Sequence, residues 1–309
     1  MIGRARSSYG AIILKRRALR SIALISVVAV VTAAIAFAVV YWVKHGSGER
    51  SATLKAWTDG AYDRVYLSSG KQLEETPLSS FWLIMRGFSA YQLATAQINV
   101  QDTLSYIDES IIALRKALLV GAGRMDARVR YVLGKAYYQK GPQYADQAAA
   151  NLEAALAASL EAPDLNEYLG LAYAALHDYR KSVIAFSQAL GSDPSDLLLL
   201  SIARSYLELG ERDSARAYLI RCAENSKDSH VIMQAKLLLG KILSETGDLA
   251  GAEKEYLSIL EIDGDNAEAH FALGELYSAG GDAVKARAEW RKTLRIDPTH
   301  GPARARLSL

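Results

Sequence analysis

One spacing, found four times between Leu169 and Pro298, constrains the fold more than any other feature of the chain. In each copy a small residue is followed by a large one three positions later, by a second small one after nine more, and by a second large one after four more. The anchors are Gly170, Tyr173, Ser182 and Phe186; Ala203, Tyr206, Ala215 and Leu219; Gly240, Leu243, Ala252 and Tyr256; and Gly274, Tyr277, Ala286 and Trp290. Two short helices that pack as a hairpin produce this pattern, because small residues stand where backbones approach and large ones fill the remaining space. Such repeats build surfaces that hold other proteins, so the pattern favours binding over catalysis.

The first and last copies resemble the tetratricopeptide repeat most closely. Leu169-Gly170-Leu-Ala-Tyr173 is followed by Ser182, Phe186 and Asp193-Pro194, and the last copy ends in the same way at Asp297-Pro298. A further copy begins at Gly134. The resemblance implies an all-α fold, a right-handed α-solenoid of about five helix-turn-helix repeats over residues 124–298.

The flanking segments are less regular. Residues 44–123 predict a helical linker and a degenerate or capping repeat, with a first helix over 81–96 and a second around Ile111–Leu118. We also expect a helical segment over 52–68 and another helix before Pro77, where apolar residues follow a helical period. Residues 299–309 predict a short polar cap, which the end of a repeat array needs in order to keep its last apolar face out of water.

An apolar segment near the amino terminus predicts a membrane anchor. Residues 22–43 contain no charge, and as a helix they would extend roughly 33 Å, enough to cross a hydrocarbon core of about 30 Å. Residues 1–21 carry six basic side chains and no acidic one, which predicts that this tail stays in the cytoplasm and that the repeats lie outside it, in the periplasm if the protein is bacterial. A cleaved signal peptide is the alternative, because Ala36-Phe37-Ala38 has the form of a cleavage site, but the apolar run continues beyond it.

Other classes of function are disfavoured. The chain after the anchor is slightly acidic and lacks a basic run with interleaved aromatic residues, so nucleic acid is not an expected partner. The five histidines show no metal-ligand spacing, and the single cysteine, Cys222, falls at a small, buried repeat position. We expect no cofactor, no catalytic site and no enzymatic activity.

The resemblance also implies where a partner would bind, since the first helix of each tetratricopeptide hairpin lines a concave groove. The positions that follow the small anchors, together with those one turn away, give a candidate peptide-binding groove of Tyr131, Lys135, Tyr138, Leu171, Arg204, Lys241 and Phe271. Its mixture of apolar and basic side chains suits an extended or helical peptide with apolar and acidic residues.

The paired lysines and asparagines that grip acidic carboxyl termini in this family are absent here, which disfavours the role of cytosolic chaperone adaptor. The sequence thus predicts a membrane-tethered, extracytoplasmic scaffold or adaptor that binds protein or peptide partners in envelope assembly, secretion or protein maturation. The alternative is an obligate non-catalytic subunit of an export or transport complex, and the oligomeric state is left open.

Overall fold

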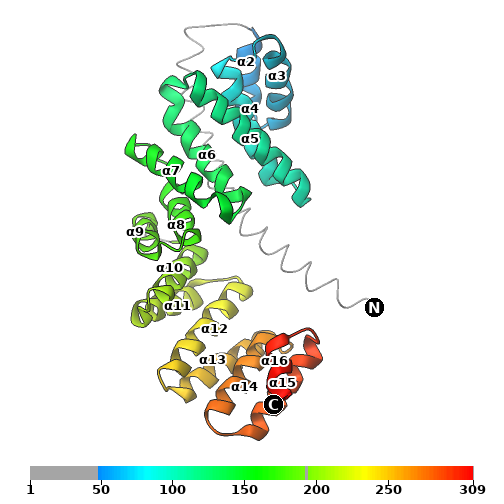
Figure 1. The fold of residues 1–309 in the computed structure, drawn as a ribbon, viewed down its shortest axis with the longest axis vertical. Coiled ribbons are helices and arrows are strands. Elements are labelled where there is room, and N and C mark those ends of the chain that lie inside the picture. The colour runs from blue at the N-terminus through cyan, green and yellow to red at the C-terminus, as the bar shows by residue number, and fades with distance from the viewer. Residues whose placement is uncertain (1–47, 192–193, 309) are drawn as a thin grey trace. The chain divides into compact units, whose positions relative to one another are not determined.

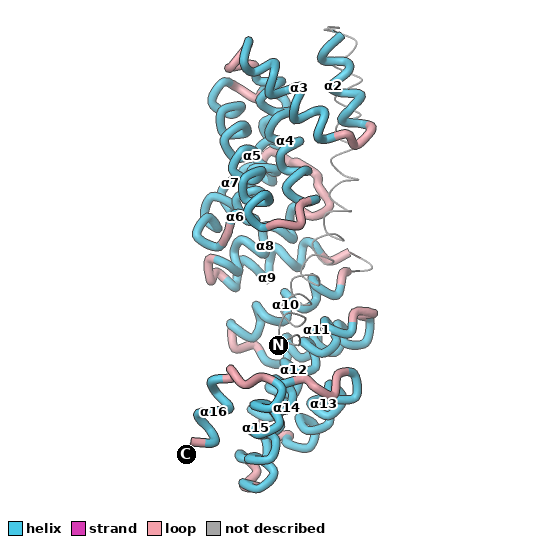
Figure 2. The backbone as a smooth tube through the Cα atoms, turned by 90° about the vertical axis from the view of Figure 1, so that its right-hand side faces the viewer, coloured by secondary structure: helices cyan, strands magenta, loops and turns pink. Residues whose placement is uncertain are grey.

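The computed structural model describes residues 48–191 and 194–308, and over these residues it contains α-helices, two one-turn 3-10 helices and no strand (Figures 1 and 2). The chain divides into an N-terminal unit, residues 1–189, and a C-terminal unit, residues 190–309. The predicted anchor at 22–43 and the basic tail before it lie outside the described residues. Within the described ranges, no helix is both long and apolar enough to cross a membrane.

The N-terminal unit is built from antiparallel helices in which each helix packs against the next one along the chain. They are α2 (Gly48–Thr58), α3 (Tyr62–Glu75), α4 (Ser80–Ala96), α5 (Val100–Val120), α6 (Asp126–Lys140), α7 (Ala145–Ala157), α8 (Leu165–Ala175) and α9 (Tyr179–Ala189), with 3-10 turns η1 (Gly123–Met125) and η2 (Pro142–Tyr144). One apolar core runs through the unit from Leu54 to Ala185.

The C-terminal unit continues the same alternation of first and second helices. Its helices are α10 (Asp196–Glu208), α11 (Arg212–Asn225), α12 (Ser229–Glu245), α13 (Leu249–Ile262), α14 (Ala267–Ala279), α15 (Ala283–Ile296) and α16 (Gly301–Leu307). Side-chain acceptors cap several of these helices; Asn266 Oδ1, for example, accepts a hydrogen bond from the Ala269 amide at 3.0 Å. The short helix α16 packs against α15, where Ala303 is buried beside Trp290.

The glycines of the repeat stand opposite the large residues that the spacing pairs with them. A Cβ atom added to any of these glycines would overlap a side chain of the second helix. The pairs are Gly87 with Leu114, Gly134 with Leu152, Gly170 with Phe186, Gly240 with Tyr256, and Gly274 with Trp290. The close helix contacts inferred from the spacing are therefore confirmed.

In most of the described hairpins the turn between the two helices contains a residue with positive φ. Gly247 (φ 87°) and Gly281 (φ 82°) provide it in two hairpins, and each is followed by an aspartate that caps the next helix. In the α8–α9 hairpin His177 takes the same place with φ 59°, and its Nδ1 lies 2.7 Å from the Tyr179 hydroxyl. His177 is thus a turn residue whose ring is engaged locally.

One helix prediction in the N-terminal unit needs correction. The helical segment expected over 52–68 is two helices, because the chain turns at Gly60, where φ is 74°. The irregular repeat expected before residue 124 corresponds to the hairpin of α4 and α5, with Gly87 facing Leu114 as in the other repeats. Its surplus residues lengthen α5 to 21 residues, against 14 in α15.

Candidate functional site

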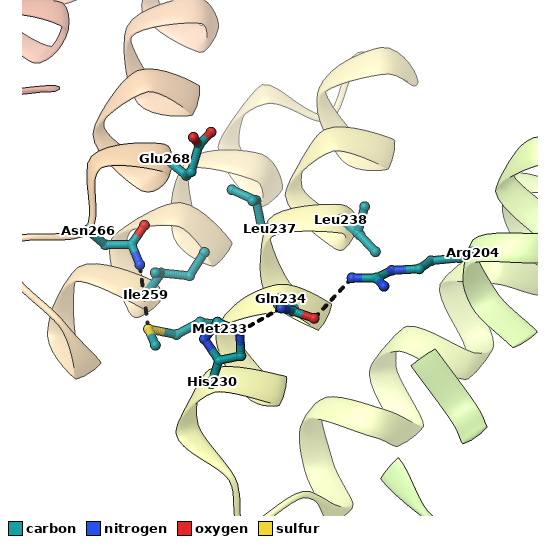
Figure 3. Close-up of a pocket in the computed structure, with 9 residues that line it drawn as sticks. All are labelled: Arg204, His230, Met233, Gln234, Leu237, Leu238, Ile259, Asn266 and Glu268. Atoms are coloured by element: carbon teal, nitrogen blue, oxygen red, sulfur yellow. Dashed lines mark hydrogen bonds between the residues drawn. The ribbon is translucent and has the colours of Figure 1, made fainter. Parts of the chain in front are cut away.

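The C-terminal unit has an open hollow of about 320 Å³ on the side of its first helices (Figure 3). Side chains of α10, α12 and α14 line it, together with one from α13 and the capping residue of α14. They are Arg204, His230, Met233, Gln234, Leu237, Leu238, Ile259, Asn266 and Glu268. Five of the nine lie on α12, within three turns of that helix, so α12 forms most of the wall.

The rim of the hollow on the α10 side is polar and connected. Arg204 Nη2 donates to Gln234 Oε1 at 3.0 Å, and Gln234 Nε2 lies 2.7 Å from His230 Nε2 (Figure 3). Partial burial against α12 lowers the pKa of Arg204, but guanidinium groups remain protonated in proteins at neutral pH. The guanidinium therefore presents a fixed positive charge beside an apolar wall that includes Met233 and Leu237.

Three of the five acidic side chains on α10, α12 and α14 have a basic partner among the described residues, namely Glu245, Glu268 and Glu275, whereas Asp196 and Glu208 form no ion pair there. Glu268 Oε1 lies 3.4 Å from His300 Nε2, and Glu275 accepts hydrogen bonds from the Arg306 guanidinium at 2.6 and 2.9 Å. Arg204 and Lys241, by contrast, form no ion pair with any residue that the structure describes. Arg204 at the hollow and Lys241 further along α12 thus carry positive charges without an ion-pair partner among the described residues, and Glu268 places one carboxylate on the α14 side of the hollow.

The predicted groove residues are divided by the structure. Arg204 lines the hollow, Lys241 is exposed further along α12, and Phe271 is half-buried with its ring 4.7 Å from that of His300. In the N-terminal unit Tyr138 and Leu171 are half-buried. Tyr131 and Lys135 differ from the expectation, because both are buried in the interior and do not reach the surface as groove contacts.

The sequence reasoning missed most of the hollow. His230, Met233 and Gln234 precede Leu237 by one or two turns on the same face of α12, so helical periodicity extended toward the amino terminus would have found them. Ile259 and Asn266 come from a second helix and from a cap, and no periodic signal points to them.

Lys135 belongs instead to a buried cluster between α6 and α8. Its Nζ lies 2.7 Å from Asp164 Oδ2, and the Tyr131 hydroxyl donates to the same carboxylate. The ammonium also lies over the rings of Tyr168, Tyr131 and Tyr91, at 4.5, 5.0 and 5.6 Å from their centroids. Burial lowers the pKa of Lys135, and the Asp164 carboxylate opposes that shift. The cluster satisfies its own charges, so its role is to hold the two helices together.

Glu167, half-buried on α8 beside this cluster, gives the unit a predicted pH dependence. Burial, and then the charge of Asp164, raise its pKa from 4.5 to about 7, while Lys135 acts in the opposite direction. The folded state therefore holds this proton more tightly than the unfolded chain. The contribution of Glu167 to stability is then full below pH 4.5 and is lost as the pH rises through about 7.

We expect Glu167→Gln to increase the free energy of unfolding, relative to the unmodified protein, more above pH 7 than below pH 4.5. Urea denaturation of both proteins on either side of this range measures the difference, and comparing them removes the contribution of all other carboxylates. A difference that does not change with pH would contradict the assignment.

Among the residues that the structure describes, no group of three or more His, Cys, Asp or Glu side chains is placed to hold a metal ion. Cys222 is fully buried, and its thiol lies 3.3 Å from the Asp196 carbonyl oxygen. Burial raises the pKa of this thiol to about 11, so it is a packed, protonated side chain at neutral pH.

Comparison with known proteins agrees with this geometry. A tetratricopeptide-repeat family model matches residues 145–196, 200–267 and 237–300. The C-terminal part of a TPR repeat-containing protein from Cytophaga hutchinsonii has a TM-score of 0.61 at 16% identity, with 84% of this chain and 100% of that chain covered. No curated protein sequence matches this chain significantly.

Two further solved structures share the fold. PilW, a widely conserved type IV pilus biogenesis factor, has a TM-score of 0.56 at 18% identity, covering 72% of this chain and 98% of PilW. PilF of Pseudomonas aeruginosa has a TM-score of 0.53 at 15% identity, covering 72% and 96% of the two chains. At these identities the likeness is one of fold. The family match over residues 145–196 and 200–300, together with the glycine contacts that recur there, shows that this part of the chain consists of tetratricopeptide repeats.

Proposed function

We propose that this protein is a membrane-tethered adaptor whose C-terminal unit captures peptide segments that carry both apolar and acidic side chains. The observation that supports the proposal is the hollow of α10, α12 and α14, in which an apolar wall stands beside Arg204, with Lys241 exposed further along α12; neither cation has an ion-pair partner among the described residues. Apolar contact provides affinity in such a site, and charge complementarity provides specificity and encounter rate.

The spacing of the two charges suggests the pattern of the ligand. Arg204 is held at Gln234, and Lys241 is seven residues further along α12, which corresponds to about 10.5 Å on the helix axis. A peptide in the polyproline II conformation advances about 3.1 Å per residue with three residues per turn, so two of its side chains three positions apart lie on one face and match this separation. The ligand we propose therefore has two acidic residues separated by two others, with an apolar side chain that contacts Leu237 or Leu238.

Replacement of both Arg204 and Lys241 by alanine is expected to weaken peptide capture by well over tenfold, equivalent to more than about 1.4 kcal/mol. Fluorescence anisotropy of labelled synthetic peptides with this acidic-and-apolar pattern measures the change. Arg216→Ala with Arg221→Ala is the matched control, because it removes the same charge from exposed positions of α11, a second helix.

Equal weakening by both double variants would mean that net charge, and not the groove, governs binding. A loss that disappears at high salt would show that the two cations only steer encounter, since exposed charges are screened beyond about 8–10 Å at physiological ionic strength.

The tether rests on the sequence of residues 1–43. A charge-free run of spanning length follows a basic tail, which favours a cytoplasmic amino terminus and an extracytoplasmic repeat region. We propose that the adaptor acts in this location, periplasmic in a bacterium, in envelope assembly, secretion or protein maturation. PilW shows that the fold is used in pilus biogenesis.

A reporter pair fused after Leu309 tests the location. An export-dependent phosphatase should be active there, and a fluorescent protein that matures only in the cytoplasm should be dark. Neutral replacements of Lys15, Arg16, Arg17 and Arg20 should make the orientation mixed, because these charges set it. Cytoplasmic fluorescence from the unmodified fusion would refute the topology.

A further inference from the structure

Helix α2 begins at one end of the N-terminal unit (Figure 1), and the start of α4 and the end of α5 lie at the same end. The Arg50 guanidinium, in the first turn of α2, lies 5.3 Å from the centre of the Phe81 ring at the start of α4. Ser80 Oγ, next to Phe81, donates to the carbonyl of Gly121, which caps α5, at 3.0 Å. We call this the proximal end and define it by residues 48–51, 78–81 and 119–124.

Large apolar side chains project from the proximal end. Leu78 is 70% exposed and Leu119 is 85% exposed, and Val120 is exposed beside it. Leu78 is two residues before Ser80, and Leu119 and Val120 directly precede Gly121, so the hydrogen bond between Ser80 and Gly121 brings them to one place. Single exposed apolar residues are ordinary, whereas a group at the tips of neighbouring segments marks a contact surface.

Basic side chains border this apolar group. Arg115 and Lys116 lie four and three residues before Leu119, on the same face of α5, and Arg124 follows in the next turn. All three are exposed, and none forms an ion pair with the described residues. The exposed acids of this end are Glu49 in the first turn of α2 and Glu74 and Glu75 at the end of α3.

The opposite end of the same helices has different charges. It exposes Asp59, Asp63, Asp102 and Asp146 at the turns that join α2 to α3, α4 to α5 and α6 to α7. It also exposes apolar side chains, Ile98 at 71% and Val100 at 66%. That end also exposes Lys55 and Arg64, so the two ends differ in the balance of charge: four aspartates are exposed there, whereas three basic side chains without an ion-pair partner among the described residues border the apolar group of the proximal end.

The chain that precedes α2 adds a constraint. Four residues, 44–47, separate the proposed membrane span from Gly48, and even fully extended they reach no more than about 18 Å from Val43 to Gly48. The first residue of α2 must then lie within about that distance of the end of the span. This step rests on the proposed tether.

We propose that the proximal end of the N-terminal unit docks on the surface of the bilayer that anchors the protein. Leu78 and Leu119 enter the interfacial region of the leaflet, and Arg115, Lys116 and Arg124 bind anionic lipid headgroups. Apolar residues with basic neighbours favour this location, since apolar burial and attraction to anionic lipid act together. The opposite end of the same helices, with its four exposed aspartates, then faces away from the bilayer.

Site-directed fluorescence quenching on the full chain in vesicles tests this proposal. The vesicles contain equal parts of phosphatidylglycerol and phosphatidylcholine, with some lipids spin-labelled near the headgroup. On a Cys222→Ala background, Leu119→Cys or Leu78→Cys carries an environment-sensitive fluorophore. Ile98→Cys is the matched control, because Ile98 is similarly exposed at the acidic end.

We expect the fluorophore at position 119 or 78 to be quenched about twofold or more over that at position 98, because quenching falls steeply with distance from the lipid surface. Neutral replacement of Arg115, Lys116 and Arg124 by glutamine, or vesicles of phosphatidylcholine alone, should remove most of that excess. Equal quenching at both ends, or none, would overturn the docking, and an excess unaffected by both changes would overturn the role of anionic lipid.

Flotation of the same samples separates the two proposals. A chain that does not float with the vesicles refutes the tether itself. A chain that floats, keeps its helical ellipticity and shows no excess quenching at position 119 or 78 refutes only the docking of the proximal end.

Discussion

Replacement of Lys135 by methionine is expected to lower the free energy of unfolding of α6 and α8 by about 3–5 kcal/mol. Methionine preserves most of the volume but removes the cation that lies 2.7 Å from Asp164. Both side chains of this pair are almost fully buried, at 1% and 3% exposure, so the carboxylate would remain in the interior with no cation beside it. The Tyr131 hydroxyl alone does not compensate for the loss of that charge.

Lys241 provides the matched control, because it occupies the same place in its repeat. Lys135 follows Gly134 and Lys241 follows Gly240, yet Lys241 is exposed and has no ion-pair partner among the described residues. Lys241→Met should therefore change stability by no more than about 0.5 kcal/mol. Hydrogen exchange of the backbone amides measures the change, because it gives the free energy of local opening of α6 and α8 separately from the rest of the chain. A local measurement is needed because each repeat contacts only its neighbours.

A second variant separates charge from packing. Adding Asp164→Asn to Lys135→Met removes the uncompensated carboxylate, so the double variant should recover part of the lost stability. Equal, small effects of Lys135→Met and Lys241→Met would show that the buried ion pair contributes little to holding α6 and α8 together.

The different behaviour of these two lysines shows where sequence reasoning reached its limit. The repeat fixes the backbone position of both, and the glycine before each faces a large side chain, Leu152 or Tyr256, as the spacing predicts. What decides their burial is distant in the chain. Lys135 meets Asp164 and tyrosines that include Tyr91 on α4, and no local pattern in α6 reports partners 29 and 44 residues away.

The corresponding acid near Lys241 is engaged elsewhere. Six residues before the next repeat glycine stands Asp164 in one case and Glu268 in the other. Glu268 is on the rim of the hollow and lies 3.4 Å from His300, a residue of the last turn before α16. Lys241 is consequently left exposed on α12, which is why a prediction made from repeat position alone treated a structural lysine and a surface lysine as equivalent.

The groove itself shows the same division. Arg204 was predictable, because the residue after each small anchor lies on the face of the first helix that is turned away from its second helix. The hollow is formed mainly by first helices, and Arg204 lines it. Asn266 was not, since it enters the site as a helix cap whose amide reaches toward Met233 Sδ, at 3.7 Å. Similarly, the sequence placed the second helix of this repeat only around residues 111–118. The repeat spacing does not indicate whether the preceding surplus residues form a loop or, as observed, extend α5 to Val100.

Replacement of Gly274 by leucine is expected to destabilise the last full hairpin, α14 and α15, by about 1–3 kcal/mol. Even a Cβ atom at this position would overlap the indole ring of Trp290, which is 6% exposed and fills the space between the two helices. Because the stability of a repeat array is approximately a sum over neighbours, the loss should appear first as fraying of this hairpin and of α16 beyond it. Thermal unfolding followed by ellipticity should show a midpoint lowered by about 2–4 °C per kcal/mol, and limited proteolysis should cut earliest near Ser278. Gly280→Leu is the control, because Gly280 is exposed and a Cβ atom there makes only ordinary contacts. If both variants melt and are cleaved like the unmodified protein, the packing of Gly274 against Trp290 does not limit stability.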